Sequence, residues 1–242
     1  MSTPDTEARV RAIDAWLAAR ADPESAASQQ RYMKSELRFH GVTQKDIRQA
    51  ARDVWKETPK LDREALRALV DALFAEGSFD LRSVAIGILE RKPAIARLAQ
   101  LGGRGSRGDD LDWLVGLVRD AGCWAHVDWL AVKVIGPVLV AHPEESERAR
   151  AWAKDPDLWV RRTALLAELD ALKAGGGDFA RFTEIAVPML GARDFWIRKA
   201  LGWVLREVSK KHPALVRAFV DEHGDTMSGL TRREATKYLA PE

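Results

Sequence analysis

The chain has 242 residues, of which 46% are hydrophobic, and it carries a formal net charge of +2. This length and composition exclude a disordered chain and suit a large folded domain, whereas the small net charge excludes neither a nucleic-acid nor a protein partner. The single cysteine excludes an internal disulfide, and because the five histidines are scattered we expect no metal site. The N-terminus is polar and no apolar run reaches 18 residues. We therefore expect a cytoplasmic protein without a membrane span.

Apolar residues recur at helical spacing along nearly the whole chain, which predicts an all-α fold. Proline, glycine and capping residues divide the pattern into predicted helices over 6–20, 23–36, 43–57, 61–75, 79–90, 93–101, 109–119, 124–141, 144–154, 157–172, 178–190, 194–211, 213–222 and 229–239. Helices of this length, paired through short turns, predict an α-solenoid of HEAT-like repeats that forms a single domain over residues 1–242. The concave groove of such an array is the expected binding surface.

The first segment with candidate chemistry is 122–140. Trp124 and Asp128 are four residues apart, so they share one face at the start of a predicted helix. Ala131 and Ile135 continue that face, which places the carboxylate beside apolar surface. The acid either complements the helix dipole in the first turn or, beside an indole, faces a positively charged ligand; the spacing leaves both open.

Two later segments share a pattern in which Trp159 matches Trp196 and Arg162 matches Lys199. This internal similarity, one helix pair apart, supports a repeat array. Arg162 lies at the edge of a predicted core stripe. It either bonds to a neighbouring helix end or clamps a phosphate, because the planar guanidinium fork suits phosphate oxygens.

The predicted helix 194–211 has two distinct faces. Its core face consists of four aliphatic residues at helical spacing: Ile197, Leu201, Val204 and Val208. The opposite face alternates indoles with cations: Trp196, Lys199, Trp203, Arg206 and Lys210. Either neighbouring helices cover these large apolar indoles, or the face binds nucleic acid, with cations neutralising phosphates and indoles stacking on bases.

Together these segments resemble the AlkD-like family of DNA glycosylases, which are built from HEAT-like repeats. The likeness extends over most of the chain and includes the Trp124–Asp128 pair, RYMKSELRFHGV at 31–42, LWVRR at 158–162, IRKALGWVLRE at 197–207 and LTRREATKY at 230–238. The resemblance implies an enzyme of base excision repair. Such an enzyme excises N3- and N7-alkylated purines, of the 3-methyladenine and 7-methylguanine type, from duplex DNA.

Carried over residue by residue, the resemblance makes Asp128 the essential carboxylate, Trp124 the indole beside it and Trp203 a second aromatic residue of the active cleft. Arg162 and Tyr32 match residues near the DNA. The remaining residues expected to contact DNA are the aromatic and basic ones of the two similar segments: Lys199, Arg206, Trp159 and Trp196.

The expected chemistry follows from the charge of the substrate. An alkylated purine is already cationic and leaves without protonation, so no general acid, metal or organic cofactor is expected. Asp128 would stabilise positive charge on the sugar and orient the attacking water. The expected working form is a monomer bound to duplex DNA that contains alkylated purines. Two alternatives stay open: a non-enzymatic HEAT-repeat scaffold for another protein, and a protein that binds DNA structures without catalysis.

Overall fold

The regular structure of this chain is helical. The computed structural model describes residues 4–100 and 107–239. Within these ranges there is no β-strand, and the single isolated bridge pairs Arg38 with Ser78. The prediction of an all-α fold is confirmed.

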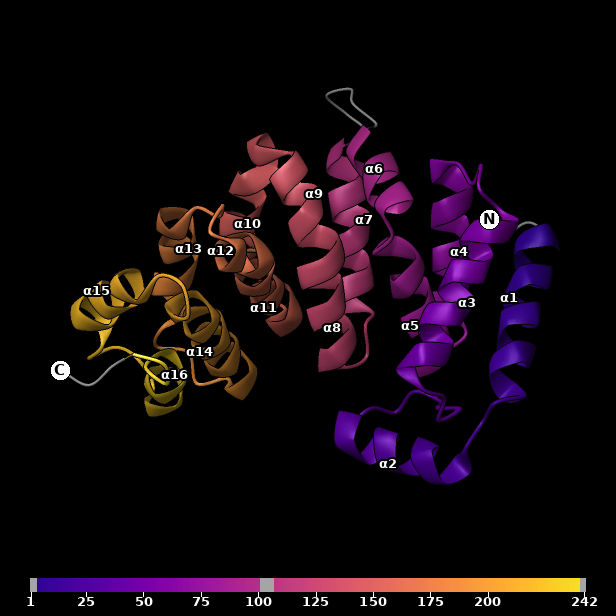
Figure 1. Cartoon of the computed structure of the whole chain (residues 1–242), viewed down its shortest axis with the longest axis horizontal. Coiled ribbons are helices and arrows are strands. Elements are labelled where there is room, and N and C mark those ends of the chain that lie inside the picture. The colour runs from indigo at the N-terminus through magenta and orange to yellow at the C-terminus, as the bar shows by residue number, and fades with distance from the viewer. Residues whose placement is uncertain (1–3, 101–106, 240–242) are drawn as a thin grey trace. The chain divides into compact units, whose positions relative to one another are not determined.

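The chain divides into two compact units, Met1–Leu130 and Ala131–Glu242. The helices of the first unit are α1 (Pro4–Ala18), α2 (Pro23–Met33), α3 (Gln44–Glu57), α4 (Arg63–Ala75), α5 (Phe79–Leu89), α6 (Lys92–Gln100), α7 (Arg107–Arg119) and α8 (Trp124–Leu130) (Figure 1). The single domain predicted over the whole chain stays a prediction.

Helix α5 is the centre of the first unit. Ten of its eleven residues are buried, as expected for a helix that is apolar almost all round. Helices α3 and α4 pack against it, and α6 and α8 also contact it. Ser78 caps its N-terminus by accepting a hydrogen bond from the N–H of Leu81. This central helix therefore gives α8 a fixed support.

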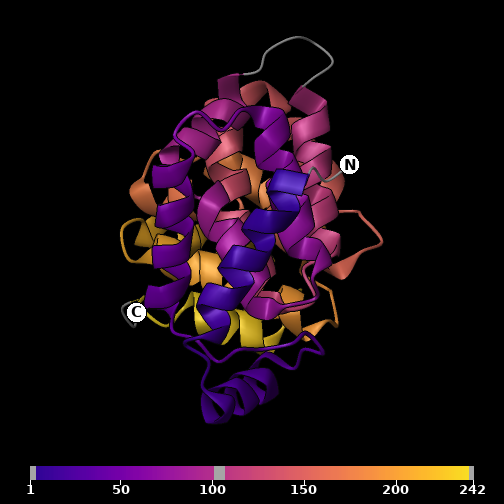
Figure 2. The same ribbon diagram turned by 90° about the vertical axis from the view of Figure 1, so that its right-hand side faces the viewer.

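Helix α2 is attached differently, because none of its residues is buried. Figures 1 and 2 both show it lying across one end of the other helices of the first unit. The side chains of Gln29 and Gln30 donate to the carbonyl oxygens of Val42 and Leu37. Hydrogen bonds to the following segment therefore help to hold α2 in place.

The second unit is also helical throughout its described part. Its elements are the π-helix η1 (Ala131–Ile135), α9 (Gly136–Ala141), the 3-10 helix η2 (Pro143–Glu145), α10 (Ser146–Trp152), α11 (Leu158–Leu166), α12 (Leu169–Ala174), α13 (Phe179–Ala186), the 3-10 helix η3 (Val187–Met189), α14 (Phe195–Ser209), α15 (Pro213–His223) and α16 (Gly229–Ala235).

Helix α14 is the centre of the second unit. Helices α11, α12, α15 and α16 all pack against it. The four residues of its predicted core face, Ile197, Leu201, Val204 and Val208, are at most 1% exposed, which confirms that stripe. Because helices surround α14, residues outside the stripe are buried as well, among them Gly202 and Glu207.

The predicted continuous helix over 124–141 is interrupted. It is α-helical to Leu130, forms the π-helix η1 and resumes as α9. Pro137, in the first turn of α9, has no backbone N–H and cannot donate to the preceding turn, which accounts for the local change in hydrogen bonding. π-Helical turns are frequent next to functional residues, and this one begins shortly after Asp128.

The same stretch, Trp124–Ala141, has the length and apolar composition of a helix that could cross a membrane, and it alone does so in the described part of the chain. Of this window, 56% is buried within the protein. This degree of burial is typical of a core helix.

Candidate functional site

Trp124 and Asp128 lie on α8, in the first unit, and both are half-buried. The turn before α8 requires glycine, since Gly122 has φ 72° and a Cβ there would come within 3.1 Å of the Arg82 guanidinium and the Leu37 side chain. The Asp128 carboxylate is therefore neither sealed in the core nor fully solvated. In such a position its charge is screened less than in bulk water.

Tyr32, at the end of α2, lies against Trp124. The two ring centroids are 5.8 Å apart with an interplanar angle of 75°, an edge-on contact, and the tyrosine is 67% exposed. The hydroxyl of Ser35 ties this region to the start of α8 by donating to the carbonyl oxygen of Gly122 at 3.1 Å. Two predicted site residues from distant parts of the sequence are thus brought together.

A buried histidine of α8 contacts helix α5 and the turn before α8. His126 is 1% exposed, lies 2.9 Å from the Ser83 hydroxyl and 3.0 Å from the Ala121 carbonyl oxygen, and stacks on Phe79 at 4.4 Å. Burial lowers the pKa of His126 to about 4. The imidazole is therefore neutral near pH 7 and adds no positive charge close to Asp128.

In the second unit, the matched indoles Trp159 and Trp196 contact each other. Their centroids are 5.8 Å apart with an interplanar angle of 51°, and both side chains are half-buried. Asp157 caps α11 by accepting from the N–H groups of Trp159 and Val160, which fixes the start of that helix. Phe195 extends the cluster: it is 50% exposed and lies edge-on to Trp196 at 5.1 Å.

The structure corrects the predicted role of Arg162. This side chain is 2% exposed, its guanidinium donates to the backbone carbonyl oxygen of Trp196, and it lies over the Trp196 ring at 5.5 Å from the centroid. Of the two interpretations of the sequence, the bond to a neighbouring helix is the one observed. A guanidinium buried this deeply cannot reach a DNA phosphate without repacking of the two helices.

The structure also changes the interpretation of Lys199 and Arg206. Helix α16 packs closely on this part of α14, since a Cβ at Gly202 would lie 2.6 Å from Cβ of Glu234. The ammonium of Lys199 donates to the Glu234 carboxylate at 2.5 Å, and the guanidinium of Arg206 donates to the same carboxylate. The hydrogen bond from Lys199 is the main reason that the pKa of Glu234 is lowered.

A neighbouring helix therefore covers the middle of the indole and cation face. Lys199 and Arg206, predicted to contact DNA phosphates, are both paired with one acid of the protein itself, which offsets one of their two charges. Trp203 lies between them on the same helical stripe and is half-buried, so part of its indole surface is still accessible.

Sequence reasoning missed the roles of Glu234 and Phe195. Nothing in the local pattern around Glu234 indicates its partners, because they precede it by about thirty residues and are reached only when α16 folds onto α14. Phe195 could have been recognised from the sequence, because it is itself an aromatic residue directly before Trp196. In the described ranges, no three His, Cys, Asp or Glu side chains are grouped so that they could hold a metal ion.

Fold and site together define an all-α protein with an acid and an indole on one helix of the first unit and an indole-rich, basic helix at the centre of the second. The chain matches the family model described as DNA alkylation repair enzyme over residues 13–239, and it belongs to that family. The resemblance inferred from the sequence is confirmed.

A solved structure supports the fold. The chain is similar to a protein from Enterococcus faecalis described as "Predicted DNA alkylation repair enzyme", with a TM-score of 0.77 and 24% sequence identity. The match covers 92% of this chain and 98% of that one. No curated protein matched in a separate comparison. At this level of identity the likeness shows a shared fold.

Proposed function

We propose that this chain is a DNA glycosylase that hydrolyses the N-glycosyl bond of cationic N3- and N7-alkylated purines in duplex DNA. The observation that carries the proposal is the half-buried carboxylate of Asp128, one helical turn after Trp124, whose ring contacts the exposed ring of Tyr32. Membership of the DNA alkylation repair family supports alkylated DNA as the target.

The reaction needs stabilisation of positive charge more than proton transfer to the base. When the bond between C1′ of the sugar and the purine nitrogen breaks, the alkylated base leaves as a neutral molecule and its positive charge passes to the sugar. Asp128 would stabilise that charge electrostatically and accept a hydrogen bond from the water that attacks C1′. The products are the free base, an abasic site and one proton.

The indole of Trp124 would hold the cationic nucleotide before bond breaking. Its face attracts positive charge through the ring quadrupole, worth roughly 0.5–2 kcal/mol. Tyr32 would contact the nearby sugar–phosphate backbone. Arg162 would not contact the DNA, because it is bonded to the first turn of α14 and lies over the ring of Trp196.

The identity of the released base tests the proposal. The protein is incubated with methylated genomic DNA, and the soluble fraction is analysed for free bases by mass spectrometry. Release of 7-methylguanine and 3-methyladenine supports it. Duplex binding without base release would favour a protein that binds DNA structures. Failure to bind duplex DNA even at low salt would favour a scaffold for another protein.

Selectivity for charged lesions is expected to be strong. A neutral base such as uracil leaves as an unfavourable anion unless an acid protonates it, and general acid catalysis contributes about 10²–10⁴ in rate. We therefore expect uracil to be released from duplex oligonucleotides at least about 100-fold more slowly than 7-methylguanine, by the same reasoning. Comparable rates for the two lesions, measured side by side, would contradict a mechanism driven by the charge of the base.

Removing the charge of Glu234 is expected to strengthen DNA binding. Glu234→Gln leaves Lys199 and Arg206 without their carboxylate, so they become available to phosphates. The plot of log K against log salt for an undamaged duplex should then steepen by up to about 1.8, or roughly 0.9 for each new phosphate contact. Fluorescence anisotropy at several salt concentrations between about 50 and 200 mM measures this slope.

Glu222→Gln is the matched control, because Glu222 is an exposed acid of α15 and the change in net charge is the same. Its slope should equal that of the wild type. An equal steepening in both variants would mean that net charge alone, and not the release of two particular cations, sets the affinity.

A further inference from the structure

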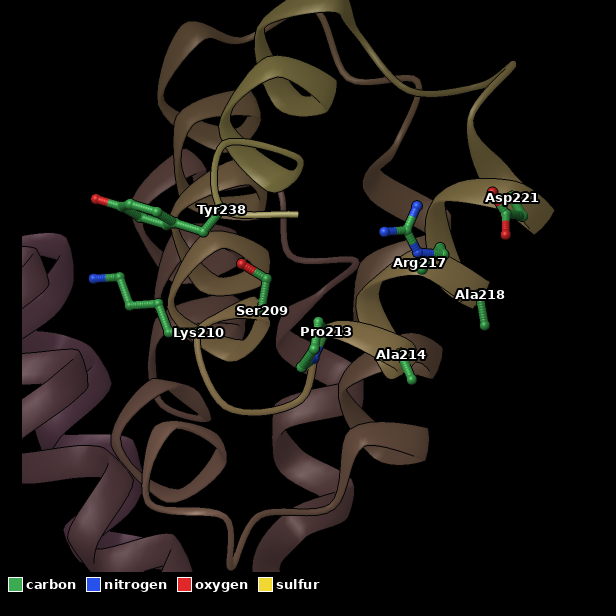
Figure 3. A pocket seen from close by; sticks show the side chains of 8 residues that line it. All are labelled: Ser209, Lys210, Pro213, Ala214, Arg217, Ala218, Asp221 and Tyr238. Atoms are coloured by element: carbon green, nitrogen blue, oxygen red, sulfur yellow. The ribbon is translucent and has the colours of Figure 1, made fainter. Parts of the chain in front are cut away.

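A cavity that the proposed function does not use lies at the C-terminal end of α14. It has a volume of about 800 Å³ and is formed by the end of α14, one face of α15 and Tyr238, which follows α16 (Figure 3). Lys210, the last cation of the indole and cation face, lines it together with Arg217. The face of α14 thus continues past the part that α16 covers.

Two ammonium groups lie near the ring of Tyr238. It is 52% exposed, and the ammonium groups of Lys210 and Lys237 lie 5.0 Å and 5.9 Å from its centroid. Both lysines are exposed. In Figure 3 the side chains of Tyr238 and Lys210 extend in the same direction from the cavity. An aromatic ring flanked by two ammonium groups suits a ligand that has both an anionic and an apolar part.

The acid nearest to Lys210 offsets only part of the positive charge of this region. Glu207 accepts from the Lys210 ammonium at 2.7 Å, yet it is itself 8% exposed and also lies 3.7 Å from Lys173 and from Arg206. One buried carboxylate is therefore shared by three cations, which leaves positive charge at the surface. The other acid of the lining, Asp221, lies at the side of the cavity opposite Tyr238 and Lys210 (Figure 3).

We propose that Lys210, Lys237 and Tyr238 form a second DNA-contact site, which binds the sugar–phosphate backbone of the duplex away from the lesion. The ammonium groups bind phosphate oxygens and the phenol ring packs against deoxyribose. This inference rests on the proposed function for the identity of the polyanion.

Salt-dependent binding of an undamaged duplex tests the second site. In the Lys210→Gln and Lys237→Gln double variant, the slope of log K against log salt should become shallower by about 1.8, or 0.9 for each lost phosphate contact. Tyr238→Ala should weaken binding several-fold, whereas Tyr238→Phe should bind as the wild type does. Thermal unfolding of every variant checks that the fold is retained.

Lys211→Gln is the matched control, since this lysine is exposed, follows Lys210 directly and does not line the cavity. Its slope should stay at the wild-type value. The second site is refuted if the double variant keeps the wild-type slope. It is also refuted if Lys211→Gln makes the slope as much shallower as Lys210→Gln or Lys237→Gln does alone.

These outcomes separate the two proposals. If methylated purines are released but the double variant binds like the wild type, the second site is wrong and the glycosylase proposal stands. If no base is released but DNA binding depends on Lys210 and Lys237, the glycosylase proposal is wrong and the second site stands. A protein that binds no duplex DNA at low salt overturns both.

Discussion

Replacing Asp128 by asparagine is expected to slow the release of 7-methylguanine by about 100- to 1000-fold, the usual cost of removing one electrostatic contact to a transition state. Asparagine has nearly the same shape but no charge, so it cannot stabilise the positive charge that develops on the sugar. Duplex binding should change little, because a carboxylate does not attract the DNA backbone. Single-turnover release from an oligonucleotide with one 7-methylguanine measures the rate, and anisotropy measures the affinity.

Asp120→Asn is the appropriate control, since Asp120 is an exposed acid shortly before α8 and the substitution makes the same change in charge. It should release the base at the wild-type rate. Wild-type activity in Asp128→Asn would show that the carboxylate has no part in the chemistry. Equal losses in both variants would show that the effect is not specific to the Asp128 carboxylate.

Arg162→Ala is expected to destabilise the protein and not to remove a phosphate contact. The substitution leaves the carbonyl oxygen of Trp196 without its charged donor, and a hydrogen bond from a charged group contributes about 1.5–3 kcal/mol to the free energy of unfolding. It also removes the guanidinium from the Trp196 ring. Urea unfolding should show a lower midpoint, while the salt dependence of DNA binding by the folded protein stays the same.

Arg193→Ala provides the comparison, because Arg193 is an exposed arginine just before α14. Its free energy of unfolding should stay within about 0.5 kcal/mol of the wild-type value, as for most surface substitutions. The opposite result would be an Arg162→Ala variant that keeps the wild-type free energy of unfolding while its salt dependence shows one phosphate contact fewer. That result would mean that the guanidinium leaves its buried position when DNA binds.

The attachment of α2 has a consequence for Tyr32. Since no residue of α2 is buried, the contact between Tyr32 and Trp124 depends on hydrogen bonds such as the one from Ser35 to Gly122. Segments held mainly by exposed hydrogen bonds open at a low cost in free energy. An element of this kind can adjust to a bound duplex without disturbing the core around α5.

Sequence periodicity alone determined the helices and several of their faces. It predicted the core stripe of α14 and the shared face of Trp124 and Asp128, because the angle between two residues of one helix depends only on their spacing. The match between Trp159 and Trp196 was also visible in the sequence, and the structure brings these two rings into contact.

Only the tertiary structure decided what each face meets. Arg162 and Lys199 occupy matched positions, yet the first is buried against Trp196 and the second pairs with Glu234. Helical spacing fixes a direction around a helix axis but does not specify which element covers that direction. The partner is selected when distant helices pack, as α16 does on α14, and that packing is a property of the whole chain.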